Sequence, residues 1–177
     1  CLGESDVPFT PIHMGPGMLV KSALQERFSL MMFGWSQIAI DIQPLAVMLT
    51  GQGHLHGFTH TYLGAVLVAV GAAITGKHLA EFGLKLFDLP DHLPIGWRVA
   101  FLSAFIGTFS HVLLDSVMHA DLQPFAPWRL DNPFLEYISV SNLHWFCLGA
   151  GILGLIVYPI MESVRPRHNH SLQARRP

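Results

Sequence analysis

The segment SHVLLDSVMHADLQPF, residues 110–125, places ionisable side chains at helical spacing in otherwise apolar sequence. His111, Asp115 and His119 recur at every fourth residue, so on an α-helix they form one stripe that rises about 6 Å per step. An imidazole and a carboxylate one turn apart can hold a divalent cation, above all zinc. The alternative is an Asp–His hydrogen bond that serves only helix packing. Because a carboxylate within a membrane is costly, the spacing favours the metal interpretation.

Two further polar sets interrupt apolar sequence elsewhere in the chain. His56 and His60 lie four residues apart in HGFTH, and Gln37 and Asp41 are separated by the same interval in GWSQIAIDIQPL. On helices, each pair would lie on one face. The sequence therefore predicts that separate helices direct His and Asp side chains towards a common interior.

Composition indicates a membrane protein. Of 177 residues, 51% are hydrophobic and 12% are charged, with a mean hydropathy of +0.42. An ordinary soluble domain carries roughly 25% charged residues. A net charge of −2, with basic residues dispersed except at the tail, does not indicate a nucleic-acid partner. Cys1 and Cys147 are too few and too far apart for a disulfide framework. Because the sequence begins with Cys instead of Met, we expect that the chain has been processed or trimmed. Lipid modification of Cys1 is an alternative that stays open.

The elements that must position these side chains are expected to be transmembrane helices. Crossing a bilayer takes about twenty apolar residues, and the segments that qualify are residues 29–50, 60–76, 97–118 and 143–161. The predicted fold is an all-α, polytopic membrane helix bundle with about four transmembrane helices.

Shorter elements complete this expected fold. Residues 77–94 place apolar side chains on one helical face, which predicts a short interfacial helix. The Pro-rich stretch 121–133 is expected to be a loop. One membrane-embedded domain is predicted over residues 1–162, followed by a basic, disordered tail over residues 163–177.

Lys and Arg residues predict the orientation of the bundle. Of the basic residues considered, Arg129 alone would face one side of the membrane. The other side would carry Arg27, Lys77, Lys85, Arg98, Arg165, Arg167, Arg175 and Arg176. The positive-inside rule makes the basic side, with the C-terminus, cytoplasmic. The histidines at positions 54, 56, 60, 119 and 144 lie at the opposite ends of the spans. The site is therefore expected to face outward, near the outer headgroups.

Three motifs also carry a family resemblance. FTPIHMGPG, HGFTHTYLGA and SHVLLDSVMHADLQPFAPW, with an Asp and a Pro in the first long span, resemble the bacterial inner-membrane family of metal-dependent hydrolases. That family includes the LexA-binding inner-membrane hydrolase, and the resemblance covers approximately residues 8–130. The family is itself distantly similar to zinc-dependent phospholipase C and P1 nuclease, whose metal sites combine scattered histidines with a bridging aspartate.

Residue by residue, the resemblance implies specific metal ligands. They are His13, Asp41, His60, His111, Asp115 and His119, with Asp41 as the bridging carboxylate, and the HGFTH spacing adds His56. Bringing His13 to the others requires a short N-terminal helix over residues 14–27, antiparallel to the first span. Gly57 stands where the family often carries an arginine, so no phosphate-binding arginine is evident.

These observations predict a membrane-bound, metal-dependent hydrolase that holds one to three Zn²⁺ ions. Asp41 would orient or deprotonate the attacking water, and a phosphoester of a lipid or lipid-linked molecule is the expected substrate class. The alternative from another class is a metal-binding or metal-transporting membrane protein without hydrolysis. A structural protein that acts through its basic tail would leave the His and Asp residues unexplained.

Overall fold

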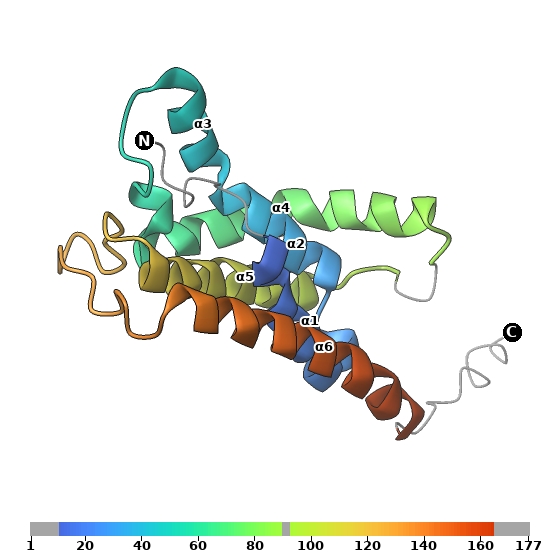
Figure 1. Cartoon of the computed structure of the whole chain (residues 1–177). Helices are drawn as coiled ribbons and strands as arrows, with labels where there is room; N and C mark the ends of the chain where they lie inside the picture. The colour runs from blue at the N-terminus through green and yellow to red at the C-terminus, as the bar shows by residue number, and fades with distance from the viewer. Residues whose placement is uncertain (1–10, 90–92, 165–177) are drawn as a thin grey trace, which may run out of the picture.

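The computed structural model describes residues 11–89 and 93–164, and this part of the chain consists of helices and loops without any strand (Figure 1). The elements are η1 (Pro11–His13), α1 (Met14–Leu24), η2 (Gln25–Arg27), α2 (Leu30–Ile40), α3 (Ile42–Thr50), η3 (Phe58–His60), α4 (Tyr62–Leu86), α5 (Trp97–Met118) and α6 (Val140–Val164). Helices α4, α5 and α6 are long and apolar enough to cross a membrane. The predicted all-α membrane bundle is thus confirmed. Cys1 and the tail from residue 165 onward lie outside the described residues.

Small side chains bring α2, α4 and α5 close together. The buried positions of α4 include Ala65, Ala69, Ala72, Ala73, Gly76 and Ala80, which recur at helical spacing. On α5, Ala104 packs against the alanines of α4, and Gly107 lies against Phe33 and Ser36 of α2. Lipid tails are as apolar as the helices themselves, so helices in a bilayer associate through close packing of this kind rather than through a hydrophobic force.

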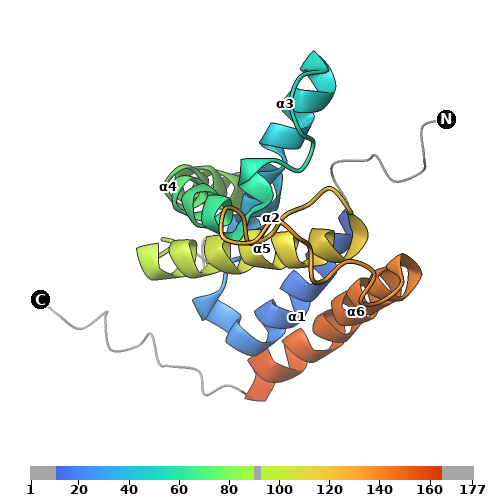
Figure 2. The ribbon, with the colours of Figure 1, turned by 90° about the vertical axis from the view of Figure 1, so that its left-hand side faces the viewer.

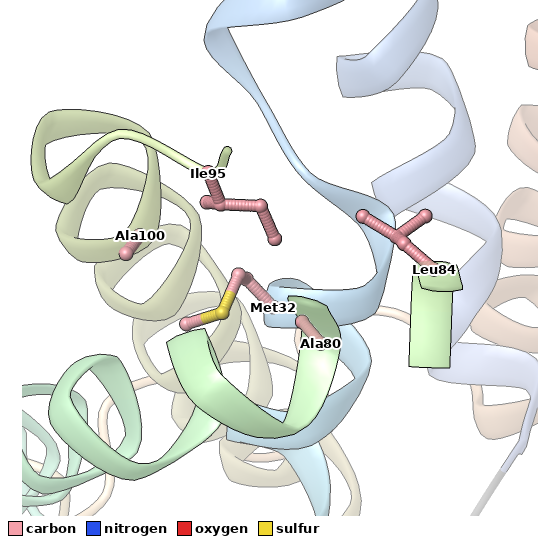
Figure 3. Packing of buried hydrophobic residues seen from close by; sticks show 5 residues of the cluster. All are labelled: Met32, Ala80, Leu84, Ile95 and Ala100. Carbon is pink, nitrogen blue, oxygen red and sulfur yellow. The ribbon is translucent and has the colours of Figure 1, made fainter. Parts of the chain in front are cut away.

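A cluster of larger side chains fixes the other end of the same three helices. Met32 of α2 packs with Ala80 and Leu84 of α4, and with Ile95 and Ala100 around the start of α5 (Figure 3). The Ile95 backbone N–H also donates to Glu81 Oε1 over 3.0 Å. Ile95, just before α5, is therefore held against α4 by both packing and a hydrogen bond.

The first predicted span, residues 29–50, is not one helix. It consists of α2 and α3, which meet at Asp41, and α3 points away from the rest of the bundle in both views (Figures 1 and 2). Pro44 explains the break, because its ring would clash with the carbonyl of Ile40 and it has no N–H to donate there. In the first turn of a new helix the missing N–H costs nothing. The break leaves Asp41 at the end of α2 instead of within a span.

The predicted interfacial helix over residues 77–94 is also corrected. Residues 77–86 continue α4 without interruption from its start at Tyr62, where the Thr61 hydroxyl accepts from Gly64 N–H over 2.9 Å. Lys77 forms an ion pair with Glu81 one turn later, and its ammonium lies 5.4 Å from the centre of the Trp97 ring. These contacts accommodate the charged residues that suggested a separate, surface-lying helix.

The predicted N-terminal helix is confirmed as α1, which packs along α6. A Cβ added at Gly154 would lie 2.6 Å from the backbone nitrogen of Leu19, and one added at Gly151 would lie 3.2 Å from Gly15 Cα. Lys21 is accommodated because its ammonium donates to the carbonyls of Gln25 and Phe28, each over 2.9 Å. The lysine thereby closes the turn that sends the chain back along α2.

We expect Gly154→Leu to lower the thermal stability of the detergent-purified protein, because the new side chain would meet the backbone of α1. Overpacking of this kind costs about 1–3 kcal/mol. Gly149→Leu is the matched control on the same helix, since a Cβ there meets nothing within 4 Å. Equal melting temperatures for the two variants would contradict the packing of α1 against α6.

Candidate metal centre

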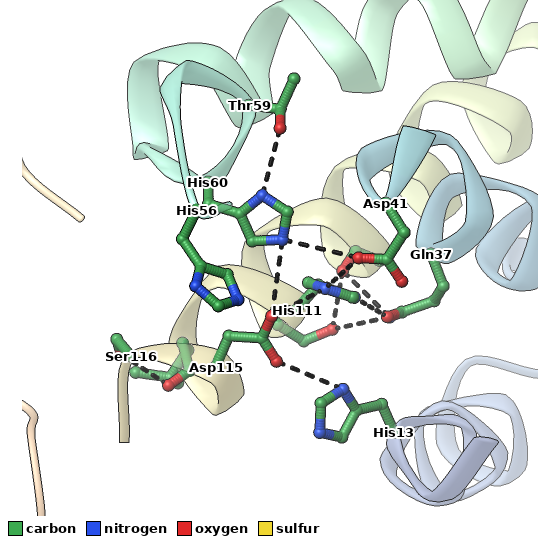
Figure 4. A network of polar contacts seen from close by, with 12 residues as sticks. His13, Gln37, Asp41, His56, Thr59, His60, His111, Asp115 and Ser116 are labelled. Atoms are coloured by element: carbon green, nitrogen blue, oxygen red, sulfur yellow. Dashed lines mark hydrogen bonds and ion pairs between the residues drawn. The ribbon is translucent and has the colours of Figure 1, made fainter. Parts of the chain in front are cut away.

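Three elements bring buried ionisable side chains together at one end of the bundle. Asp41 comes from the junction of α2 and α3, His60 ends η3, and His111 with Asp115 lies one turn apart on α5 (Figure 4). All four residues are buried, with exposed fractions from 0% for His60 to 6% for Asp41. Each offers a ligand atom, and these atoms lie within 4.8 Å of one another.

The spacing of these atoms fits one tetrahedral ion. His111 Nε2 lies 3.1 Å from Asp41 Oδ1 and 3.0 Å from Asp115 Oδ2, and His60 Nε2 lies 3.5 Å from each of the same oxygens. Two ligand atoms about 2.0–2.2 Å from a tetrahedral zinc ion are roughly 3.3–3.6 Å apart. The four nitrogen–oxygen distances are thus close to the edge lengths of a tetrahedral zinc site.

The two imidazole nitrogens, and the other oxygen of Asp41, lack hydrogen bonds that would explain their burial without a ligand. Within the described part of the chain, His60 Nε2, His111 Nε2 and Asp41 Oδ2 are buried and have no hydrogen-bond partner. Buried polar atoms are normally paired, because an unpaired one costs about 1–3 kcal/mol. The two imidazole nitrogens face the carboxylates at short distance without the geometry of a hydrogen bond, which is how ligand atoms around a shared cation are arranged.

Neighbouring side chains contact the Nδ1 atoms of His60 and His111, the nitrogens that face away from the two carboxylates. The Gln37 amide donates to Gly107 O over 3.1 Å, and its Oε1 lies 2.6 Å from His111 Nδ1. Thr59 Oγ1 lies 3.1 Å from His60 Nδ1. When Nδ1 donates to these oxygens, Nε2 carries the lone pair, and this is how ligating histidines are usually fixed in proteins. Gln37 therefore orients the candidate ligand His111, a role that the sequence did not predict.

His13 lies beside the four-residue group. Its Nδ1 is 3.6 Å from Asp115 Oδ1, and its ring stands edge-on to His111 with centroids 5.5 Å apart. Burial lowers the pKa of His13 to about 4, so the imidazole is neutral at pH 7. Both ring nitrogens are buried without a hydrogen-bond partner. The structure thus brings His13 to the site, as the resemblance implied, next to the second oxygen of Asp115.

A second group of ligand atoms adjoins the first. His56, His119 and Asp115 also offer atoms within 4.8 Å of one another, and the His56 and His119 rings stack with centroids 4.1 Å apart. His119 follows the last residue of α5 and has extended backbone angles, so it leaves the helical stripe. Burial and then the charge of His56 lower the pKa of His119, which favours its neutral, ligating form.

One expectation about these residues changes with the structure. His56 and His60 do not share a helix face, because η3 begins only at Phe58; their rings nevertheless meet edge-on at 5.2 Å. Asp41 as the bridging carboxylate stays a prediction of the resemblance, and Asp115 is the residue common to both groups of ligand atoms. Sequence reasoning missed Asp121, which contacts His56, and Thr59; in each case the only signal was a polar residue near a candidate histidine.

Comparison with known proteins agrees with this membrane architecture. The model of the family described as YdjM inner membrane protein matches residues 19–170, which include every candidate ligand except His13. No curated protein and no solved structure matches the chain significantly. Since the family match covers most of the sequence, the chain belongs to the YdjM family of inner membrane proteins.

Proposed function

We propose that this protein is a membrane-bound, metal-dependent hydrolase whose buried site is formed by Asp41, His60, His111 and Asp115. The observation that carries the proposal is the set of short distances among two imidazole nitrogens and two carboxylate oxygens that make no hydrogen bonds with one another. Zinc is the metal that this donor set suits best.

The residues of the site support hydrolysis in distinct ways. A divalent metal ion bound there would supply Lewis acidity and lower the pKa of a water molecule towards 7. Gln37 and Thr59 fix the ring orientation of the two histidine ligands. Asp41 Oδ2 is buried without a hydrogen-bond partner, so it can accept a proton from the attacking water while Oδ1 faces the histidines.

The surroundings of the site favour an amphiphilic substrate. Exposed aromatic side chains gather at the same end of the bundle, among them Trp128, Tyr137 and Trp145, with exposed fractions of 78%, 82% and 68%. Trp and Tyr are typical of the membrane interface. A phosphoester of a lipid or lipid-linked molecule would present its polar group at this level, so it remains the substrate class that we propose.

A metal transporter is the alternative, and the placement of ligands argues against it. Both groups of candidate ligands in the described chain lie where α5 ends and α4 begins. A permeation path needs polar groups along its length. At the opposite end of α4, Lys77 and Glu81 are paired with each other and do not continue a row of ligands.

Zinc should stabilise the wild-type protein against heat and stabilise Asp115→Asn much less. At a free zinc concentration of 100 times the dissociation constant, the wild type would gain about 2.7 kcal/mol. With chelator, Asp115→Asn should be as stable against heat as the wild type or more stable, because a buried carboxylate without a cation is costly and the amide is neutral. Asp131→Asn, a change in an exposed loop, is the control. If zinc and chelator leave the melting temperatures of all three proteins unchanged, the site binds no zinc.

The zinc-loaded protein should hydrolyse a generic phosphodiester, and Asp41→Asn should lower kcat by about 10²–10⁴-fold, as expected for loss of a general base. Metal content is measured in the same samples, so that loss of metal and loss of the base are separated. His54→Ala removes an exposed histidine and should leave turnover unchanged. Zinc flux into proteoliposomes without turnover of any phosphoester would favour the transporter instead.

The proposed orientation predicts a labelling pattern in intact cells. In a background without Cys1 and Cys147, a cysteine at Gln52 should react with a membrane-impermeant thiol reagent from the periplasm. A cysteine at Lys85 should react only after permeabilisation, because the basic side is cytoplasmic. Both positions are exposed, so burial does not limit either reaction. The reverse pattern would place the site on the cytoplasmic side.

A further inference from the structure

Helix α3 leaves the bundle and presents large apolar side chains on its outside. Ile42, Leu45 and Leu49 are 56%, 49% and 79% exposed, and they lie on neighbouring turns of the helix. Scattered exposed apolar residues need no explanation, but a contiguous apolar surface marks contact with a membrane or with another protein. The question is therefore what covers α3.

The direction of α3 decides how it can meet a bilayer. Helices α4 and α5 pack side by side along the axis of the spans, whereas α3 runs across that axis at the end of the bundle that carries the candidate metal centre (Figures 1 and 2). Its nine residues extend roughly 13 Å, less than half of the roughly 30 Å of the hydrocarbon core. When α4 and α5 cross the membrane, α3 therefore lies along the membrane plane.

The chemistry of the surrounding chain selects lipid as the partner of this surface. Residues 42–76 contain no Asp, Glu, Lys or Arg, so they offer no charge with which a charged protein partner could pair. Exposed apolar side chains also continue along the chain from Phe58 to Leu63 and Leu67 on α4. Since α4 is long and apolar enough to cross a membrane, the surface of α3 continues one that already faces lipid.

The C-terminal end of α3 pairs backbone groups that lipid could not satisfy. The Gly51 N–H donates to Val47 O over 2.8 Å, and the Thr50 hydroxyl donates to Ala46 O over 2.7 Å. Gly51 has a φ of 68°, the left-handed conformation in which glycine commonly ends a helix. Because unpaired carbonyls are costly inside a bilayer, these two contacts suit a helix end in surroundings that hold little water.

Gln43 ties α3 to the segment that carries His60. Its Oε1 accepts from the Thr59 backbone N–H over 2.9 Å, and Thr59 Oγ1 lies beside His60 Nδ1. A Cβ added at Gly57 would overlap the Gln43 amide, so the glycine permits this close approach. Because of these contacts, α3 and η3 are held at one level relative to the membrane.

We propose that α3 is an in-plane helix embedded among the acyl chains of the leaflet nearest the candidate metal centre, with Gln43 as its tether to η3. The lipid bilayer is the occupant of the exposed surface of α3. This placement requires neither bound metal nor hydrolysis, so the inference stands or falls apart from the proposed function. It also sets the level of His60, which is fixed to α3 through Thr59 and Gln43.

Spin labels test this placement in the full-length protein reconstituted into phosphatidylcholine vesicles. They are attached to Leu45→Cys or Leu49→Cys in a background without Cys1 and Cys147. Collisions with O₂, which concentrates among acyl chains, are compared with collisions with a water-soluble nickel chelate. Both labels should give an O₂-to-nickel ratio like that of Leu67→Cys on α4 and severalfold above that of Gln52→Cys in the loop after α3.

A ratio like that of Gln52→Cys would place α3 in water and overturn the proposal. Labels shielded from both reagents would mean that a second copy or another protein covers α3, which overturns the bilayer as its occupant. Melting curves of the labelled proteins, compared with that of the unlabelled protein, verify that the fold is retained.

Gln43→Leu tests the tether, because leucine has a similar size but cannot accept from the Thr59 N–H. The label at Leu49→Cys should become more mobile, which narrows its spectral lines. Gln52→Leu is the matched control; its side chain is exposed, and the substitution should leave the lines unchanged. Equal mobility of the label in Gln43→Leu and in the unsubstituted background would overturn the role of Gln43.

Discussion

The burial of two carboxylates is the constraint on which this structure depends. Asp41 and Asp115 are 6% and 5% exposed in a bundle whose buried side chains are mainly apolar. Charges removed from water must be compensated by partners of opposite charge or by a metal ion. Five segments of the chain supply a histidine towards that compensation. The histidines come from η1, η3, α5 and the two loops that follow α3 and α5.

Close packing of helices next to the site makes this convergence possible. His13 reaches Asp115 only because α1 lies directly on α6, and the contact of Gly15 with Gly151 permits that approach. Gly107 likewise lets α2 approach α5, which brings Gln37 to His111. In a bilayer such contacts stabilise the bundle and position the site at the same time, so the small residues have two roles.

Sequence patterns predicted part of this arrangement well and part poorly. The third span was located correctly because α5 combines an apolar run with clear boundaries, and the spacing of His111 and Asp115 identified the core of the site. The first span was misjudged because Pro44 was given less weight than apolar composition. Contacts between distant segments, such as Asp121 with His56, leave no periodic signal and could be recognised only in three dimensions. His13 was reached through the family resemblance alone.

The break at Pro44 also bears on how the chain is made. Asp41 leaves the ribosome about 70 residues before His111, and at roughly 5–20 residues per second the interval is roughly 4–14 s. Throughout this time its carboxylate has no histidine from α5 to face. A continuous helix over residues 29–50 would place this charge in the middle of one apolar span, where an unpaired carboxylate is costly, whereas the break places Asp41 at the end of an eleven-residue helix.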